Sequence, residues 1–343
     1  MASYATLPAD LFIPEVCFEY ARQAFTTSLE MLQNLMGPSL DNPIQLVTPG
    51  DAAEGGQYVQ QPVFKRIASL ITKRDLTSFA AVDGLKLEGV NDQGVLISKK
   101  VGPVFYTPDA EYISKASPGQ ISAEFGKQAG ENAVSQLQTS IINAIIGALS
   151  AMSATAHTST SWATDIRTNL SPTVLTNALY LMGDFSGKIK HWVMRSESER
   201  DLFTDAQGRS YAGVGNLALA GNRNTNDLGL GHSVIDNAIL TVADSGFDKY
   251  ITVGLGPVAV RVFITRPLFF YPEVQYVNTE VVSRHMRGDM DYIIQIPGFA
   301  YVNGTGGANP ADAVLSTTSS WTPNYSSHKE VLMVNAVHNY SGN

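Results

Sequence analysis

A long helical pattern of apolar and polar residues dominates the middle of the chain, between residues 117 and 155. Its apolar residues recur in steps of three, four or five, which places them along one face of an α-helix. These residues are Ile121, Phe125, Ala129, Val134, Leu137, Ile141, Ile145, Leu149 and Met152. Ser117 is suited to cap the helix and Pro118 to its first turn. At about 1.5 Å per residue the helix would be roughly 50 Å long, so we expect a spine on which other elements pack.

Residues 1–50 have the pattern of an arm and not of a domain. Prolines interrupt them and leave one amphipathic segment, residues 16–36, with Phe18 and Phe25 on its apolar side. Such a segment cannot bury its apolar face alone. We therefore expect it to lie on the rest of the molecule or on a neighbouring subunit, with Phe18 and Phe25 as candidate contacts between subunits.

Residues 51–108 indicate a projecting ribbon of two strands. Two β-rich runs, 55–72 and 94–107, flank a long excursion. Over residues 55–107 basic residues outnumber acidic ones, and the candidate contacts to another subunit are Lys65, Arg66, Lys73, Arg74 and Lys86. A two-stranded ribbon is only marginally stable alone in water. Charge alone leaves two interpretations open: a ribbon lying across an acidic partner, or a solvated hairpin.

The rest of the chain alternates helical and strand patterns. Residues 109–165 contain the spine helix, and residues 166–266 indicate an α+β domain. Its expected elements are a helix at 172–183, a buried strand at 191–195, a helix at 196–206 capped by Ser196, and strands at 233–242 and 250–266. Within residues 267–343 we expect two long strands in 273–302, joined around Arg287-Gly288-Asp289, and a last strand at 331–337.

Composition limits the classes of protein to which the chain can belong. Only 16% of its 343 residues are charged, and the net charge is −8. Neighbouring subunits that cover the surface would explain this low charge density, because interface cores are depleted in charge, although a monomer with a polar uncharged surface is the alternative. Clustered basic residues for tight duplex binding are missing from so acidic a chain.

Targeting and redox signals are also sparse. The single cysteine, Cys17, excludes an internal disulfide and a cysteine-based metal site. The first residues lack a secretory signal, and the longest apolar stretch, 141–152, is too short for a membrane span, so we expect an intracellular, non-membrane protein.

The sequence offers little catalytic chemistry. None of the six histidines has metal-ligand spacing, and neither a phosphate loop nor a nucleophile elbow is present, so we expect no cofactor, metal or catalytic residue. We interpret the glycine pairs at 213–215, 229–231 and 254–256 as turns, and His191 as a core or interface residue. Asp289 and Asp291 lie two apart in a strand, hence on one face, and we expect them to meet cations of a neighbour or water.

The order of these parts resembles a known family. The most telling stretches are KKVGPVFYTPDAEYISKASPG at 99–119, KHWVMRSESERDLFTDA at 190–206 and GDMDYIIQIPGFAYVNGTGGANPADAVLSTTSSWTPN at 288–324. Over nearly its whole length the chain resembles the major capsid protein of tailed double-stranded DNA bacteriophages. That shell fold, named after a Hong Kong phage, is shared with encapsulins and herpesvirus capsid floors. The resemblance implies an α+β fold with an N-terminal arm, an extended ribbon loop, a spine helix, a peripheral domain and an axial domain at 166–266.

The resemblance also implies a function. In that family, copies of one chain form hexamers and pentamers of an icosahedral shell around the genome, and the arm and the extended loop clasp adjacent subunits. We expect the virion capsid as its location, with assembly in the host cytoplasm. Since Met1 leads almost directly into the arm, we expect a separate scaffold protein, together with a portal, a decoration protein as a further partner, and only weak contact with packaged DNA.

Three alternatives stay open at the level of sequence. An encapsulin-like compartment would have the same fold but would hold protein cargo. An α+β enzyme would be a discrete subunit or small oligomer with a concave polar pocket. A tail-tube or other virion protein fits less well, because those are mainly β and lack so long a helix.

Overall fold

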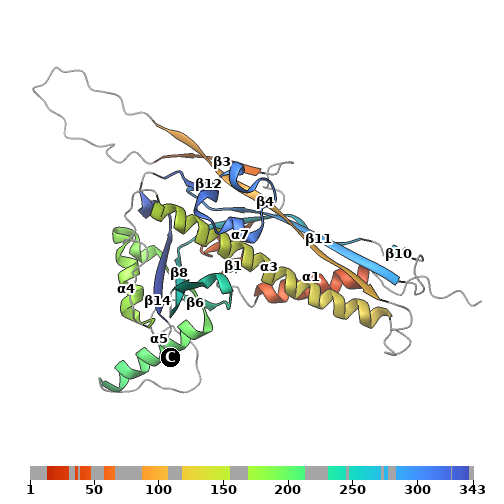
Figure 1. Cartoon of the computed structure of the whole chain (residues 1–343), viewed down its shortest axis with the longest axis horizontal. Coiled ribbons are helices and arrows are strands. Elements are labelled where there is room, and N and C mark those ends of the chain that lie inside the picture. Colours follow the sequence, from red (N-terminus) through yellow and green to blue (C-terminus); the bar gives the residue numbers. More distant parts are fainter. Residues whose placement is uncertain are drawn as a thin grey trace, which may run out of the picture.

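One long helix, α3, forms the axis of the computed structural model (Figure 1). It spans Pro118–Ala154, 37 residues, or about 55 Å at about 1.5 Å per residue. This confirms the predicted spine, while its expected cap, Ser117, lies outside the described residues. The structure describes residues 14–30, 35–37, 39–47, 58–65, 87–106, 118–154, 169–212, 231–244, 247–271, 274–276, 283–325 and 327–339.

The apolar face of α3 is buried as its periodicity predicts. From Ala129 to Met152 every predicted position is buried, whereas Ile121 and Phe125 near the start are half-buried. In the second half of the helix Ile142, Ala144 and Ala148 are buried as well. Strands of both sheets and the segment after residue 295 surround this half, which explains why its burial extends beyond one face.

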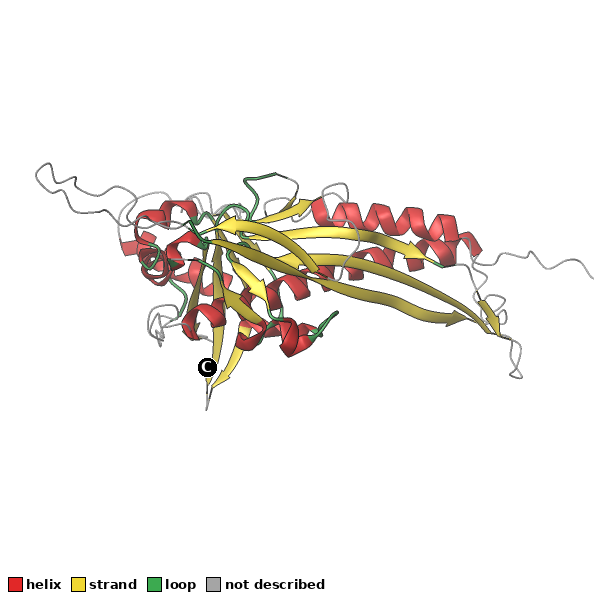
Figure 2. Cartoon of the chain, turned by 90° about the horizontal axis from the view of Figure 1, so that it is seen from above, coloured by secondary structure: helices red, strands yellow, loops and turns green. Residues whose placement is uncertain are grey.

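A nine-stranded sheet runs along α3. Its order is β1-β2-β9-β11-β4-β12-β13, with β10 paired to β11 and β3 paired to β4. The strands are β1 (Met36–Gly37), β2 (Ile44–Val47), β3 (Tyr58–Phe64), β4 (Gly89–Tyr106), β9 (Val260–Phe270), β10 (Val274–Tyr276), β11 (Ser283–Gln295), β12 (Phe299–Tyr301) and β13 (Trp321–Pro323). The antiparallel pair β4–β11 gives the sheet its length, and Figure 2 shows the helical layer beside these long strands.

The predicted junction at Arg287-Gly288-Asp289 is wrong. These residues lie inside the single strand β11, where the register with β4 shifts between Met286 and Gly288. Gly288 is required for packing and not for a turn, because a Cβ there would lie 2.9 Å from Cδ1 of Phe270.

A five-stranded sheet lies on the other side of α3. Its order is β14-β8-β5-β6, with β7 paired to β8. The strands are β5 (His191–Met194), β6 (Gly231–Val234), β7 (Thr241–Asp244), β8 (Phe247–Leu255) and β14 (Met333–Asn339). Helices α4 (Pro172–Tyr180) and α5 (Ser196–Ala212) and the 3₁₀ turns η2 (Gly183–Lys188) and η4 (Ala238–Leu240) flank it. The expected buried strand at 191–195 and the helix after it are confirmed, but Ser196 is the first residue of α5 and not its cap.

The two sheets divide the chain at positions that differ from the expected boundaries. The expected domain end at residue 266 falls inside β9, which belongs to the nine-stranded sheet, while β14 from the C-terminal region joins the five-stranded sheet. Residues 250–266 gave one strand-like pattern because both halves are apolar, but a turn after Leu255 separates β8 from β9. Strand partners depend on long-range pairing, which local periodicity does not encode.

The N-terminal helix α1 (Pro14–Glu30) packs along α3 of its own chain. Cys17 and Ala21 are fully buried at this contact. A Cβ at Gly126 would overlap the carbonyl oxygen of Cys17, and one at Gly130 would overlap that of Ala21. Small residues on both helices thus allow close backbone approach, and this part of the predicted arm lies on the molecule itself.

Residues 296–325, here named the closing segment, cover the C-terminal half of α3. They contain β12, α6 (Asn303–Gly306), α7 (Asp312–Leu315), η5 (Thr318–Ser320) and β13, and η6 (His328–Glu330) follows them. The buried Trp321 donates its indole N–H to the carbonyl of Leu315 at 2.8 Å. Gly147 of α3 faces this contact, since a Cβ there would lie 2.8 Å from Nε1 of Trp321. The closing segment is therefore fixed on α3 next to strand β4.

Candidate assembly surface

The ribbon of β3 and β4 projects from the body of the subunit (Figure 1). The two strands pair antiparallel from Tyr58↔Val95 to Phe64↔Gly89. Near their far end Phe64 is 66% exposed, Leu87 is 56% exposed and Val63 is also exposed. A soluble subunit gains nothing from large apolar side chains held away from its core, so this end has the properties of a contact surface.

The structure places one of the five basic residues predicted on the ribbon. Lys65 lies just beyond β3, where its Nζ is 3.2 Å from a carboxylate oxygen of Glu88 and its backbone N–H donates to the carbonyl of Glu88. This pair closes the described end of the ribbon within one chain. The other four predicted residues, Arg66, Lys73, Arg74 and Lys86, lie outside the described residues.

Phe18 and Phe25 of α1 are half-buried and pack against the core of their own chain. Their neighbour on the helix, Tyr20, is 46% exposed. Because α1 already lies on α3, most of its apolar face is occupied within the subunit. Only the outer parts of Phe18 and Phe25 are open to another chain.

At the root of the ribbon a buried carboxylate joins β4 to the closing segment. Asp92 is 3% exposed, and its Oδ2 accepts the backbone N–H of Gly298 at 2.8 Å. Its Oδ1 accepts a weaker bond from the side-chain amide of Asn324 at 3.4 Å. Burial raises the pKa of Asp92, while these two hydrogen bonds and the charge of Arg261 offset part of the effect.

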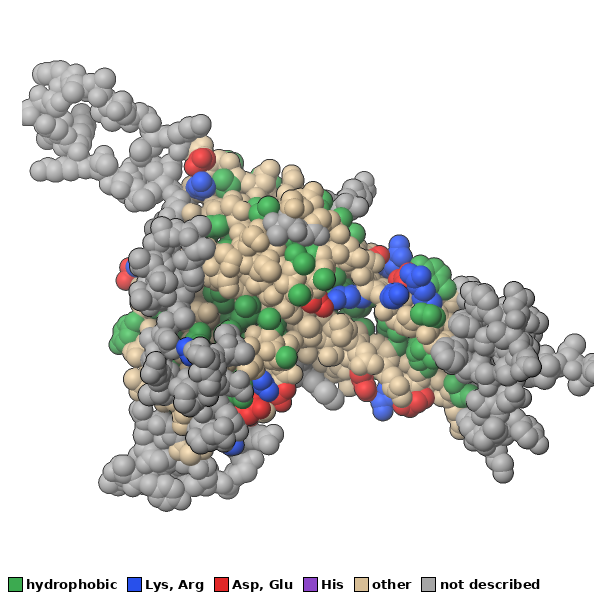
Figure 3. All heavy atoms as spheres, viewed as in Figure 1, with side chains coloured by type: hydrophobic (Ala, Val, Ile, Leu, Met, Phe, Trp, Pro, Cys, Tyr) green, Lys and Arg blue, Asp and Glu red, His purple; other side chains and the backbone are tan. Residues whose placement is uncertain are grey.

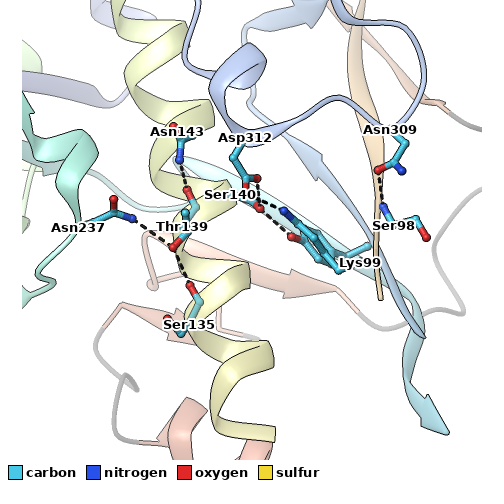
Figure 4. A network of polar contacts seen from close by, with 10 residues as sticks. Ser98, Lys99, Ser135, Thr139, Ser140, Asn143, Asn237, Asn309 and Asp312 are labelled. Carbon is cyan, nitrogen blue, oxygen red and sulfur yellow. Dashed lines mark hydrogen bonds and ion pairs between the residues drawn. The ribbon is translucent and has the colours of Figure 1, made fainter. Parts of the chain in front are cut away.

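A second polar cluster joins β4, α3, β11 and the closing segment (Figure 4). Asp312 accepts a hydrogen bond from the ammonium group of Lys99 at 2.7 Å and from the hydroxyl of Ser140 at 2.6 Å. Ser140 in turn accepts the hydroxyl of the fully buried Tyr292 at 2.8 Å. Burial raises the pKa of Tyr292. Sequence reasoning missed this cluster, although Ser140 beside Ile141 in the apolar part of α3 was a signal.

The same helix is tied to the five-stranded sheet by a shorter chain of polar contacts. The amide of Asn237, just before η4, donates to the hydroxyl of Thr139 at 3.2 Å. Thr139 donates to the carbonyl of Ser135, and Asn143 donates to the carbonyl of Thr139 (Figure 4). Helix α3 therefore fixes both sheets through polar as well as apolar contacts.

The two acidic residues of β11 meet cations of their own chain. Asp289 lies 3.0 Å from Arg287, and Asp291 lies 3.3 Å from Arg266 on β9. This corrects the expectation of a partner on a neighbour or in water, because the pairing with β9 was not visible from the sequence. Burial alone would raise the pKa of Asp289, but hydrogen bonds from Arg287 and Tyr271 and the nearby charges hold it below its ordinary value.

Exposed aromatic residues lie near the ends of the long strands, at the end of β9. Phe269 and Tyr271 form an edge-to-face pair with ring centroids 5.5 Å apart, and Val104 of β4 is also exposed. Figure 3 shows Lys and Arg side chains beside hydrophobic ones over the far end of the long strands, while most of the visible surface is uncharged. This face is a second region with the mixed character of an interface.

The described residues do not bring catalytic groups together. Within them, no three His, Cys, Asp or Glu side chains are placed to hold a metal ion. His191 is buried and bonds to the hydroxyl of Ser233 at 2.9 Å, and burial, followed by the charge of His232, lowers its pKa to about 4.

Gly254 lies within β8 and packs on Trp192, so the interpretation of this glycine as a turn is wrong. Among the described helices, none combines the length and apolar character that crossing a bilayer requires.

Comparison with solved structures shows the fold. A structure from Mycobacterium phage Bobi superposes with a TM-score of 0.51 at 11% identity, covering 99% of this chain and 96% of that one. The head structure of Helicobacter pylori bacteriophage KHP40 gives 0.49 at 9% identity, with 90% of each chain covered. The capsid of Ralstonia phage GP4 gives 0.46 at 14% identity, with 78% of this chain and 86% of that one covered. No curated protein matches the sequence.

A family model identifies the chain more directly. The family described as Gp13-like, major capsid protein 13-like, matches residues 16–332, which include both sheets, the ribbon and the spine helix. Its members are capsid proteins, which have a structural role, so the enzyme alternative is set aside. The chain therefore belongs to the major capsid protein 13-like family, a family of structural proteins of the capsid.

Proposed function

We propose that copies of this chain form the hexamers and pentamers of an icosahedral shell around a double-stranded DNA genome, with each ribbon lying on the next subunit. The observation that carries this proposal is the ribbon itself, whose described end exposes Phe64, Leu87 and Val63 away from the body. Burying a large apolar side chain contributes about 1.5–3 kcal/mol. In a closed ring the same contact is repeated at every subunit, so its contribution is made once for each copy.

The basic residues of the loop between β3 and β4 add charge complementarity to this proposal. Arg66, Lys73, Arg74 and Lys86 would face an acidic surface of the neighbour. Acidic residues on the exposed side of α1 and α3 offer such a surface, namely Glu15, Glu19, Glu30, Glu124 and Glu131. Each exposed ion pair contributes only about 0–1 kcal/mol, so charge guides the docking while apolar burial supplies its strength.

The remaining partners follow from the same proposal. A separate scaffold protein would direct assembly in the host cytoplasm, a portal would occupy one vertex, and a decoration protein would bind the finished shell. The net charge of −8 is consistent with a container that holds packaged DNA without gripping it. Contact with the genome would then be weak and would depend on a few basic residues and counterions.

The experiment that tests the proposal removes the loop. Residues 66–86 are replaced by a short glycine–serine linker in the full chain, and the products are imaged by negative-stain microscopy. We expect a subunit that melts like the unchanged one but forms no closed shells. Closed shells of normal size from this variant would refute the role of the loop.

A matched pair of substitutions tests the apolar end of the ribbon. Phe64→Ser should raise the protein concentration needed for assembly by about tenfold or more, because an apolar contact of at least about 1.4 kcal/mol is lost. Phe64→Leu keeps an apolar side chain and should assemble nearly as the unchanged chain does. Equal assembly of the two variants would show that Phe64 is not at a contact.

A further inference from the structure

The root of the ribbon is held by the closing segment, through side chains from both ribbon strands. We infer that the closing segment fixes the direction in which the ribbon leaves the subunit, and thereby positions it for the neighbouring subunit. The inference rests on the proposed function, because it supposes that the ribbon is the part that reaches the neighbour. Residues on β3, on β4 and further along β4 each supply a contact.

The first contact is at the start of β3. The hydroxyl of Tyr58 donates to the side-chain oxygen of Asn303, and its ring stacks on that of Tyr301 with centroids 6.5 Å apart and planes at 22°. Tyr301 is buried in the closing segment. The first residue of the outer strand is therefore held both by a polar group and by an aromatic ring.

The second contact is on β4, where the main-chain pairing is weakest. Strand β12 pairs with β4 at a single position, Ala300↔Gln93. The neighbouring residue Asp92 adds hydrogen bonds between β4 and the closing segment, since its carboxylate accepts from the backbone N–H of Gly298 and the side-chain amide of Asn324. Asn324 also donates to the carbonyl of Asn91 at 2.8 Å. Side chains thus carry much of the attachment between the ribbon and the closing segment.

The third contact lies further along β4, toward the body. The backbone N–H of Ser98 donates to the side chain of Asn309 at 2.8 Å, and Lys99 pairs with Asp312 at 2.7 Å. These contacts hold the inner part of β4 to the closing segment, so that a movement of the ribbon has to pivot near Asp92.

The face of the root opposite Tyr58 carries a small apolar cluster beside a hydrogen bond from Arg261 to Gln61. Val59, next to Tyr58 in β3, points to the other side of the ribbon and packs with Phe263 of β9 and Ile293 of β11. This cluster is separate from the main core. Removing the bonds to the closing segment leaves this cluster in place, so it should loosen the ribbon without unfolding the subunit.

A small change in the angle at which the ribbon leaves the subunit displaces the end of the ribbon by several ångströms. Asp92 pairs with Gln61, and Phe64 lies three positions beyond Gln61, which is about 10 Å at about 3.3 Å per residue. A rotation of about 20° at this pivot would move Phe64 by about 3–4 Å, which is as large as a whole van der Waals contact distance. A ribbon that pivots by this amount could not make the same contact on every neighbour of a closed shell.

The test measures the direction of the ribbon in the unassembled full chain by double electron–electron resonance. Spin labels are placed at Glu88→Cys, at the end of the ribbon, and at Tyr180→Cys, an exposed position on α4. The native Cys17 is fully buried, and burial raises its pKa to about 12, so it does not compete for the label. Shell formation by the same variants without labels is followed by microscopy.

The principal variant is Asp92→Ala, and Tyr58→Phe combined with Asn324→Ala is a milder one in case the first fails to fold. The control is Gln60→Ala, which removes only a contact to Gln93 within the ribbon. We expect the root variants to broaden the distribution of distances and to lower the yield of closed shells by about tenfold or more, as the loss of buried hydrogen bonds predicts. The control should change neither.

Three distinguishable results would contradict the inference or the proposed function. A distribution as narrow as that of the control would overturn the inference that the closing segment fixes the ribbon. A broad distribution with a normal yield of shells would overturn its role in positioning. Closed shells from the chain that lacks residues 66–86 would instead overturn the proposed function of the loop.

Discussion

At the scale of single residues, Asp312 links the closing segment to both β4 and the spine helix. Its carboxylate accepts hydrogen bonds from both Lys99 and Ser140. The side chains of the ion pair are largely buried, with exposed fractions of 25% for Lys99 and 24% for Asp312. Removing one partner of such a pair leaves the other charge poorly solvated, which costs more than the pair itself contributes. Substituting Asp312 therefore tests how much this cluster stabilises the subunit.

Asp312→Ala should lower the free energy of unfolding of the unassembled subunit by about 2–3 kcal/mol. Urea denaturation followed by circular dichroism measures it. Asp184→Ala is the control, because Asp184 is an exposed carboxylate on η2 and its loss should cost less than about 0.5 kcal/mol. If both variants lose equally little, the cluster does not stabilise the subunit.

His191 makes the stability of the five-stranded sheet depend on pH. Burial and the charge of His232 lower its pKa from 6.5 to about 4. Between pH 6.5 and about 4, His191 is therefore protonated in the unfolded chain but neutral in the folded one. Stability should therefore be complete above pH 6.5 and fall as the pH drops toward about 4. The fall is about 1.4 kcal/mol for each pH unit within this range.

His191→Gln keeps a partner for Ser233 but has no proton to gain. Its free energy of unfolding should depend less on pH between 6.5 and 4 than that of the unchanged chain. Urea titrations at a series of pH values measure the difference between the two. Parallel curves would show that His191 does not titrate in the way its burial predicts.

At the scale of elements, the pairing of α1 with α3 depends on glycines in the middle of a helix. Glycine costs about 0.5–1 kcal/mol relative to alanine inside a helix, so its presence there needs a packing reason. Gly130 has one, because a Cβ would overlap the carbonyl oxygen of Ala21. Gly119, near the start of the same helix, has open space around it.

The two glycines predict opposite responses to the same substitution. Gly119→Ala should raise the melting temperature slightly or leave it unchanged, as helix propensity predicts. Gly130→Ala should lower it and should increase hydrogen exchange in residues 14–30, because α1 is pushed from α3. An equal gain from both substitutions would show that α1 does not pack closely on the spine.

Elements with a strong local pattern could be predicted from the sequence. The spine helix, the buried strand at His191 and the ribbon strands follow from periodicity and composition, and the structure confirms them. Gly288 within β11 and the assignment of β9 and β14 to different sheets could not be predicted in this way. Their positions depend on strand partners far away in the sequence, about which a local pattern carries no information.

The candidate surface shows the same division between local and distant information. The basic character of the ribbon could be read directly, and its four outermost basic residues remain predictions because they lie outside the described residues. The attachment of Asp92 and Tyr58 to residues near 300 could not be foreseen, since it joins positions more than 200 apart in the chain. Phe18 and Phe25 were correctly placed on an apolar face, but that face packs mainly on its own subunit.

At the scale of the whole molecule, the subunit has one large buried core and leaves large apolar side chains exposed at its periphery. Both sheets share one buried cluster around α3, whereas the ribbon end exposes Phe64 and the far end of the long sheet exposes Phe269 and Tyr271. A low charge density over much of the surface fits contact with further copies (Figure 3). In the proposed shell these exposed apolar side chains would be covered by neighbouring subunits.

The most direct test of this conclusion is a cryo-electron microscopy reconstruction of shells assembled from the full chain. We predict a closed shell in which the outer part of the ribbon, residues 62–91, lies on an adjacent subunit, and in which Phe64 and Leu87 are buried at that contact. A reconstruction in which the ribbon lies on its own subunit, with both side chains open to solvent, would contradict it.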